Sequence, residues 1–206
     1  MIHIVSKYFS SISKHGTTIL AVNKDNRTVL IGDGQITQGS QIIKSSANKL
    51  RTLAPEVVTG FAGSLADCLT LLDELDILIK KYEGFPLLKP CVALTQLWRT
   101  EKKYQKLEAS ILVCSNKNEI IELDGVGNIL TFEGVRSIGS GSVFAESAAL
   151  ALLDIPGLSA MDIANKAMKI AADKCCYTSN QFKILELNCD NTKPENEDRI
   201  TTIKQS

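Results

Sequence analysis

The first third of the chain contains short runs of β-branched and aliphatic residues separated by polar turns. Residues 17–22 (TTILAV) and 27–31 (RTVLI) flank the four polar residues NKDN. Two such runs joined by a short turn are typical of a β-hairpin. Further short strands are predicted at residues 41–44, 49–53 and 57–59.

From Ser64 the apolar positions recur every three or four residues, which is the spacing of one helix face. These positions are Leu65, Leu69, Leu72, Leu75 and Ile79. Ser64 and Asp67 form an S-x-x-D start signal, and Gly84 with Pro86 predicts the end of this helix. A second helix is predicted to follow, with Pro90 near its first turn.

The next stretch returns to short strands. Residues 109–114, 119–123, 128–132 and 135–138 are rich in β-branched and aliphatic residues, and the turns NKN, DG and EG separate them. Consecutive strands joined by short turns of this kind predict an antiparallel meander.

Two more helices and a final strand complete the pattern. The helices are predicted at residues 143–153 and 160–176, the second capped by Ser159 and Asp162, and the strand at residues 182–187. Strands therefore alternate with helix pairs, an order that does not fit a parallel βαβ sheet. It predicts an α+β fold, a four-layer α/β/β/α sandwich of two antiparallel sheets with a helix pair on each outer face.

Composition limits the possible partners. The chain has 206 residues, 44% of them hydrophobic, with 23 basic and 23 acidic residues. This size and balance are typical of one soluble globular domain. A nucleic-acid binder would cluster lysine and arginine, and a membrane-spanning helix would need about 18 apolar residues in a row. Neither pattern occurs, so we expect neither a nucleic-acid nor a membrane partner.

The two ends differ from the rest of the chain. Residues 1–16 contain lysine, histidine and several serines but no acidic residue. This composition predicts an organellar presequence, with a disordered arm as the alternative. We expect residues 1–16 to be a leader removed on maturation, 17–187 to form the folded domain, and 188–206 to be a polar tail. If the leader is a targeting sequence, the protein resides in a mitochondrion or related organelle; otherwise it is cytoplasmic.

Several familiar catalytic motifs are missing from the sequence. The glycine-rich run at residues 138–144 has Phe144 where a G-x-G-x-x-G motif needs glycine, and no P-loop occurs, so we expect no bound nucleotide. The six cysteines form neither a CxxC redox motif nor a zinc site, and are predicted to be buried thiols. The two histidines, His3 and His15, both lie in the leader, which excludes a Ser-His-Asp triad in the folded domain.

A nucleophile without histidine needs another base. An N-terminal threonine, serine or cysteine can use its own α-amino group. The leader would end at Gly16, directly before Thr17 and Thr18 at the start of the first predicted strand. Thr17 is therefore the candidate nucleophile.

The motifs that follow this threonine resemble one family. In order, the chain contains TTILAV, GDGQITQGSQIIKSSANKLRTL, GFAGSLAD, WRT, KLEA, IGSGS and LSAMDIANKAMKIAADKCCYT. Together they resemble the HslV (ClpQ) peptidases, in the proteasome-β-like branch of the N-terminal-nucleophile (Ntn) hydrolases, over residues 17–187. The resemblance implies the sandwich fold predicted above. It also implies a threonine-type endopeptidase that is the proteolytic core of a two-component ATP-dependent protease.

The resemblance also implies a role for each of five residues. Thr17 would be the nucleophile, with its α-amine as the general base. Lys49 would lie beside it and lower the proton affinity of the amine and hydroxyl, and Asp33 would pair with Lys49 and orient it. Ser140 would hydrogen-bond near the amine and assist proton transfer. Gly63 would donate its backbone N–H to the tetrahedral oxyanion.

Assembly and ions are implied in the same way. The expected partners are a second component, a hexameric HslU-like AAA+ ATPase, further copies of this chain in two stacked hexameric rings, and unfolded polypeptide substrates. A monovalent cation, typically sodium, is expected on the main-chain carbonyls of Ala172, Cys175 and Thr178, where Ala172 replaces the glycine common in the family. Two alternatives stay open: a catalytically silent ring subunit and a stand-alone Ntn amidase.

Overall fold

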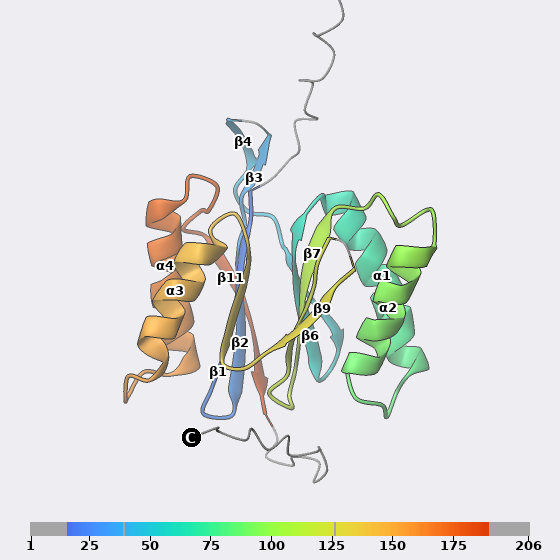
Figure 1. The fold of residues 1–206 in the computed structure, drawn as a ribbon. Coiled ribbons are helices and arrows are strands. Elements are labelled where there is room, and N and C mark those ends of the chain that lie inside the picture. The colour runs from blue at the N-terminus through green and yellow to red at the C-terminus, as the bar shows by residue number, and fades with distance from the viewer. Residues whose placement is uncertain (1–15, 39, 126, 190–206) are drawn as a thin grey trace, which may run out of the picture.

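The computed structural model describes residues 16–38, 40–125 and 127–189 of the chain. The predicted leader, apart from Gly16, and residues 190–206 of the predicted tail lie outside this part. The described residues form four layers, a helix pair, two antiparallel sheets and a second helix pair (Figure 1). The predicted α/β/β/α sandwich is confirmed.

The first sheet has the strand order β10-β1-β2-β11. Its strands are β10 (Val135–Gly139), β1 (Thr18–Lys24), β2 (Arg27–Asp33) and β11 (Phe182–Asn188), and all neighbours are antiparallel. The predicted hairpin joins β1 to β2 through Asp25 and Asn26, whose φ angles of 51° and 57° fit the left-handed turn that such hairpins favour.

The second sheet has the strand order β5-β6-β7-β8-β9. Its strands are β5 (Leu50–Ala54), β6 (Val57–Gly63), β7 (Ala109–Ser115), β8 (Ile120–Leu123) and β9 (Ile129–Phe132). A separate two-stranded sheet, which sequence analysis predicted only in its second strand, consists of β3 (Ile36–Gln38) and β4 (Gln41–Lys44).

The predicted four-stranded meander is wrong in its last member. Strands β7, β8 and β9 form a meander, but β10 pairs with β1 in the other sheet. After β9, Glu133 and Gly134 carry the chain across, and the Gly134 carbonyl accepts the Asn23 N–H at 2.6 Å. Alternation along a strand fixes which side chains are buried, but not which strand lies beside it.

A helix pair covers the outer face of each sheet (Figure 1). Helices α1 (Leu65–Lys81) and α2 (Leu88–Thr100) lie on the second sheet, and α3 (Ser142–Leu153) and α4 (Ala160–Lys174) on the first. Helix α4 ends at Lys174, two residues before the predicted end. Its predicted Ser159–Asp162 capping box is confirmed.

The predicted start of α1 is right in position but not in mechanism. Ser64 is the N-cap residue, yet its side chain makes no capping hydrogen bond. The Asp67 carboxylate instead accepts the backbone N–H of Glu108 at 3.0 Å. The S-x-x-D signal here joins the helix to the loop before β7.

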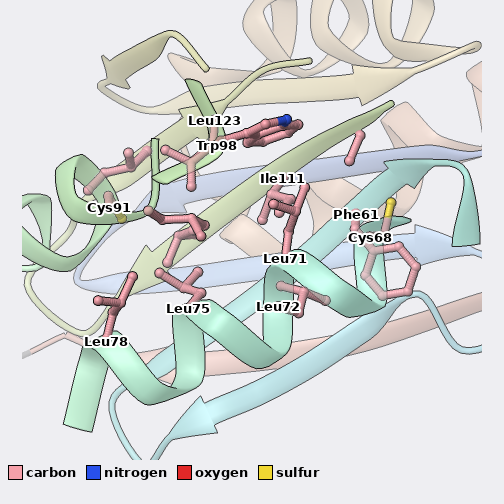
Figure 2. Packing of buried hydrophobic residues seen from close by; sticks show 14 of the residues in the cluster. Phe61, Cys68, Leu71, Leu72, Leu75, Leu78, Cys91, Trp98, Ile111 and Leu123 are labelled. Atoms are coloured by element: carbon pink, nitrogen blue, oxygen red, sulfur yellow. The ribbon is translucent and has the colours of Figure 1, made fainter. Parts of the chain in front are cut away.

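The two outer cores differ in the size of their side chains. Beneath α1 and α2 lie large apolar residues, shown in Figure 2, among them Leu71, Leu75, Trp98 and Ile111. Beneath α3 and α4 the buried helix residues are mostly alanine, namely Ala145, Ala149, Ala160, Ala164, Ala167 and Ala171. A third apolar cluster fills the space between the sheets.

The cysteine prediction holds for five of the six thiols. Cys176 is exposed, whereas Cys68, Cys91, Cys114, Cys175 and Cys189 are buried. Burial raises the pKa of Cys68, Cys91 and Cys114 to about 12.

Among the described residues, no helix is both long and apolar enough to cross a bilayer.

Candidate active site

The predicted site residues come together at one end of the two sheets. Thr17 directly precedes β1, Asp33 ends β2, Lys49 directly precedes β5, Gly63 ends β6 and Ser140 directly follows β10. Both sheets therefore contribute strand ends to one location, and the antiparallel pairing in each sheet brings these ends side by side.

Asp33 is the most completely bound of these groups. Its side chain is 0% exposed. One carboxylate oxygen accepts the Thr18 N–H at 2.7 Å, and the other accepts the N–H groups of Gln35 at 2.9 Å and Ser179 at 3.1 Å. The first oxygen also lies 3.3 Å from the Lys49 ammonium. Three main-chain donors and one cation therefore fix this carboxylate in place.

Lys49 carries its positive charge into the same buried region. Its side chain is 5% exposed, and its Nζ donates to the carbonyl of Gly16 at 2.6 Å and to the carbonyl of Gln35. Burial lowers the pKa of Lys49 below its ordinary 10.5, and the Asp33 carboxylate opposes that shift. The Lys49 ammonium therefore lies within ion-pair distance of Asp33. It also lies near Thr17, since the ammonium and the Thr17 hydroxyl both bind the Gly16 carbonyl.

Thr17 is nearly buried, with 6% of its surface exposed. Its Oγ1 donates to the Gly16 carbonyl at 2.5 Å, so the hydroxyl and the Lys49 ammonium bind the same oxygen. The Ser140 N–H donates to the Thr17 carbonyl at 2.7 Å. Ser140 thus contacts the Thr17 carbonyl through its main chain, whereas the sequence predicted a hydrogen bond near the Thr17 amine that assists proton transfer.

Residues 139–141, which we call the catalytic turn, approach Thr17 closely. Gly139 has a φ of +93°, and a Cβ at this position would lie 2.1 Å from the Thr17 carbonyl oxygen. Only glycine fits both the conformation and the space.

A pocket of about 370 Å³ opens beside the threonine. Its lining includes Thr17, Gly63, Ala109, Gly139 and Ser140. Gly63 has a φ of +122°, and a Cβ there would come within 2.6 Å of the Glu108 carbonyl oxygen. The pocket therefore places the predicted nucleophile and the predicted oxyanion donor on one surface.

Comparisons with known proteins show the family to which the chain belongs. Residues 13–187 match the Proteasome subunit family. Over 172 residues the chain is 46% identical to the ATP-dependent protease subunit HslV of Wolbachia, covering 82% of this chain and 97% of the relative. The chain belongs to the HslV family. It is also 44% identical to the HslV subunit of Trypanosoma brucei over 87% of this chain and 86% of that one.

Solved structures support the HslV assignment. The crystal structure of HslV from Trypanosoma brucei has a TM-score of 0.79 and 42% identity, covering 83% of this chain and 99% of that chain. A protein described as Thiobacillus denitrificans BPH shares the fold, with a TM-score of 0.69 and 17% identity. The resemblance predicted from sequence is confirmed. As an HslV family member, the chain is the peptidase subunit of an ATP-dependent protease and a hydrolase that acts on peptide bonds.

Sequence reasoning did not predict the side-chain contacts that join this site to the loops around it. Thr18 and Thr178 are buried, their hydroxyl oxygens lie 2.7 Å apart, and the Gly141 N–H donates to Thr18 Oγ1 at 3.0 Å. The Gln35 side chain donates to the Cys176 carbonyl at 2.9 Å. These contacts join the catalytic turn and the loop after α4 to the start of β1. Their partners are main-chain groups or distant residues, so no local sequence pattern indicates them.

The predicted cation segment lies at the end of α4. Ala172 is in the last turn of the helix, Cys175 is its C-cap, and Thr178 follows in the loop, where its N–H donates to the Cys175 carbonyl at 3.0 Å. The last carbonyls of a helix have no partner within the helix and carry its negative partial charge. The segment therefore offers the donor type that a monovalent cation needs. The described residues contain no group of three His, Cys, Asp or Glu side chains suited to a metal ion.

Proposed function

We propose that this peptidase cuts peptide bonds with the Thr17 hydroxyl of a matured chain, from which residues 1–16 have been removed. One observation carries the proposal: the buried Lys49 ammonium contacts both the Asp33 carboxylate and the carbonyl of the Gly16–Thr17 bond. A cation in this position serves two reactions in turn, release of the leader and hydrolysis of substrate.

Maturation comes first, because the Thr17 nitrogen is part of an amide while Gly16 is attached. An amide nitrogen cannot act as the general base. The Thr17 hydroxyl and the Lys49 ammonium both bind the Gly16 carbonyl oxygen. This arrangement favours attack by Oγ1 on the Gly16 carbonyl carbon. The Oγ1–C bond forms, the C–N bond breaks, and the nitrogen takes the hydroxyl proton. Water then hydrolyses the ester, leaving a Gly16 carboxyl group and a free N-terminal Thr17.

In the mature chain the α-amine accepts the Oγ1 proton as the hydroxyl attacks a substrate carbonyl in the pocket. An α-amine has an ordinary pKa of about 7.7–8.0, which suits a base near neutral pH, and the adjacent Lys49 cation lowers the proton affinity of amine and hydroxyl. The Gly63 N–H is the donor for the oxyanion. The amine then protonates the leaving nitrogen, and water hydrolyses the acyl ester on Thr17.

We further propose that the chain works in two stacked hexameric rings with a separate HslU-like AAA+ ATPase that delivers unfolded polypeptide. Two observations support this assembly: the relatives are named ATP-dependent protease subunits, and the sequence has no nucleotide-binding motif. Degradation of a tagged folded protein should then require the ATPase and ATP, whereas short peptides should be cut without them. Sedimentation of the purified chain tests the ring, and a monomer that degrades folded protein would contradict it.

A bound monovalent cation and an organelle address complete the proposal. Sodium on the carbonyls of Ala172, Cys175 and Thr178 would fix the loop whose Thr178 hydroxyl contacts Thr18. Exchange of sodium for tetramethylammonium should lower activity and the melting temperature together.

If residues 1–16 form a targeting sequence, the leader fused to a reporter should direct that reporter to the mitochondrion or a related organelle.

The central experiment compares Thr17→Ala with Thr17→Ser. The alanine variant lacks the nucleophile, so it should neither mature nor hydrolyse a fluorogenic peptide. The serine variant keeps the hydroxyl and the amine and should retain measurable activity. Intact mass spectrometry should show the wild-type chain beginning at Thr17. A preparation that keeps residues 1–16 and is fully active would contradict the mechanism.

A further inference from the structure

Three charged side chains form a network beside the catalytic turn, and the mechanism above does not use them. Arg136 lies on β10, Glu122 on β8 and Glu146 on α3. The Arg136 Nε lies 2.5 Å from a Glu122 carboxylate oxygen, and its Nη1 lies 3.1 and 3.3 Å from the two oxygens of Glu146. We call these three residues the Arg136 network.

The network is more constrained than an ordinary surface ion pair. The Glu122 side chain is 9% exposed, and those of Arg136 and Glu146 are 26% and 25% exposed. The guanidinium carbon also lies 4.4 Å from the centre of the Phe132 ring. A planar guanidinium that contacts two carboxylates and an aromatic ring has little freedom to move, because its donors point in fixed directions.

The network joins three of the four layers. Strand β10 is the edge of the first sheet, β8 belongs to the second sheet, and α3 covers the first sheet from outside. Glu146 also accepts the backbone N–H of Ser137 on β10 at 2.8 Å. The α3 carboxylate therefore binds the strand both through its main chain and through the Arg136 side chain.

In the sequence, the catalytic turn lies between Arg136 and Glu146, two members of the Arg136 network. It starts three residues after Arg136 and ends five residues before Glu146. Its main-chain N–H groups hold the Thr17 carbonyl at 2.7 Å and Thr18 Oγ1 at 3.0 Å. Because Gly139 already lies against the Thr17 carbonyl, a displacement of the turn would move Thr17 as well.

We propose that Arg136 is a positioning residue for peptide hydrolysis, which sets the catalytic turn against Thr17 through its ion pairs with Glu122 and Glu146. The inference rests on the proposed function of Thr17. Arg136 does not line the pocket and contacts no reacting atom. Its effect comes through geometry, and a displacement of about 1 Å at a reacting group can cost about 100-fold in rate.

The test compares Arg136→Gln with Arg27→Gln. Arg27 forms an ion pair with Glu186 at 3.0 Å in the same sheet, at the opposite end of β2 from Asp33. With a fluorogenic peptide we expect Arg136→Gln to lower kcat about tenfold while KM changes less than twofold. Arg27→Gln should leave both constants unchanged. Arg136→Lys restores the charge and should recover part of kcat.

Loss of Arg136 leaves the largely buried Glu122 carboxylate without its cation, which could impair folding by itself. The double variant Glu122→Gln/Arg136→Gln removes both charges and separates the two effects. If it melts like the wild type and still shows the lower kcat, the positioning role is supported. A kcat within twofold of wild type in that folded variant overturns it.

Two further measurements complete the test. If neither Arg136→Gln nor the double variant folds, Glu146→Gln tests the positioning role instead. A kcat reduced threefold or more supports that role, and an unchanged kcat overturns it. Thr17→Ala, measured alongside, separates this inference from the proposed function. An active Thr17→Ala would refute the nucleophile, whereas an inactive Thr17→Ala with a wild-type-like Arg136→Gln refutes only the role of Arg136.

Discussion

Two buried clusters in this chain have nearly opposite chemistry. Beneath α1 and α2 the cluster is apolar and is built from leucine, tryptophan and other large side chains (Figure 2). At the end of the sheets the cluster around Asp33 and Lys49 is charged and is bound largely by main-chain groups. The first is stabilised by burial of apolar surface, which is not directional. The second depends on the positions of individual atoms, so we expect substitutions there to change chemistry more than stability.

Lys49→Met is the variant of the charged cluster for which we expect the largest loss of activity. Methionine fills the same space without the charge, so the Gly16 carbonyl loses its cationic partner and the mature amine loses the neighbouring cation. We expect peptide hydrolysis to fall about 10³-fold. The fold should survive, because Asp33 keeps the N–H donors of Thr18, Gln35 and Ser179.

The measurement is kcat/KM on a fluorogenic peptide together with a thermal melt. Lys44→Met is the matched control, since Lys44 is an exposed lysine on β4. Near-normal hydrolysis by Lys49→Met would show that the charged cluster serves the structure rather than the reaction.

Leu75→Ala tests the apolar cluster in the same way. Leu75 is a fully buried residue of α1, and its truncation leaves a cavity as well as losing buried surface. We expect the free energy of unfolding to fall by about 3 kcal/mol. Because the site is at the sheet ends, kcat per folded molecule should not change. Leu65→Ala on the same helix, where the leucine is 47% exposed, should cost much less in a denaturant titration.

The difference between the clusters also explains which parts of the fold and of the site could be predicted from the sequence. Apolar spacing predicted α1 and the sandwich, because period and burial are linked along one helix or strand. It did not predict that β10 leaves the meander, because pairing between strands is a long-range choice. Thr17 followed from the missing histidine and the end of the leader, whereas Asp33, Lys49, Gly63 and Ser140 came from family resemblance. The side-chain contacts of Gln35 with Cys176 and of Thr178 with Thr18 were not predicted, because they form only when distant loops meet.

Ala167→Leu examines the alanine-lined core beneath α3 and α4. Ala167 is fully buried in this cluster, so we expect a leucine there to require movement of the helices. We expect a loss of about 2 kcal/mol in unfolding free energy from overpacking. Ala151→Leu, on the exposed side of α3, is the control. Equal stabilities for the two variants would indicate that this core is loosely packed, unlike the leucine-rich core on the opposite side.

The smallest expected effect compares the N-cap residues of α4 and α1. Ser159 and Ser64 are both N-cap residues, and each has an aspartate three positions later. Only Ser159 accepts a capping hydrogen bond, from the Asp162 N–H at 3.1 Å, and the Asp162 carboxylate accepts the Ser159 N–H in return. In α1 the corresponding Asp67 carboxylate binds the Glu108 N–H instead.

The same sequence signal should therefore give two different energies. Ser159→Ala removes a hydrogen bond to an otherwise unpaired N–H and should cost about 1 kcal/mol in unfolding free energy. Ser64→Ala removes no such bond, so it should lower the unfolding free energy by only about 0.3 kcal/mol, since alanine differs little from serine when no capping hydrogen bond is made. Chemical denaturation of both variants and the wild type measures the difference. Equal losses would mean that the side chain of Ser64 caps α1 in solution. An unequal loss in the predicted direction would show that tertiary contacts, rather than the S-x-x-D pattern, decide which serine stabilises its helix.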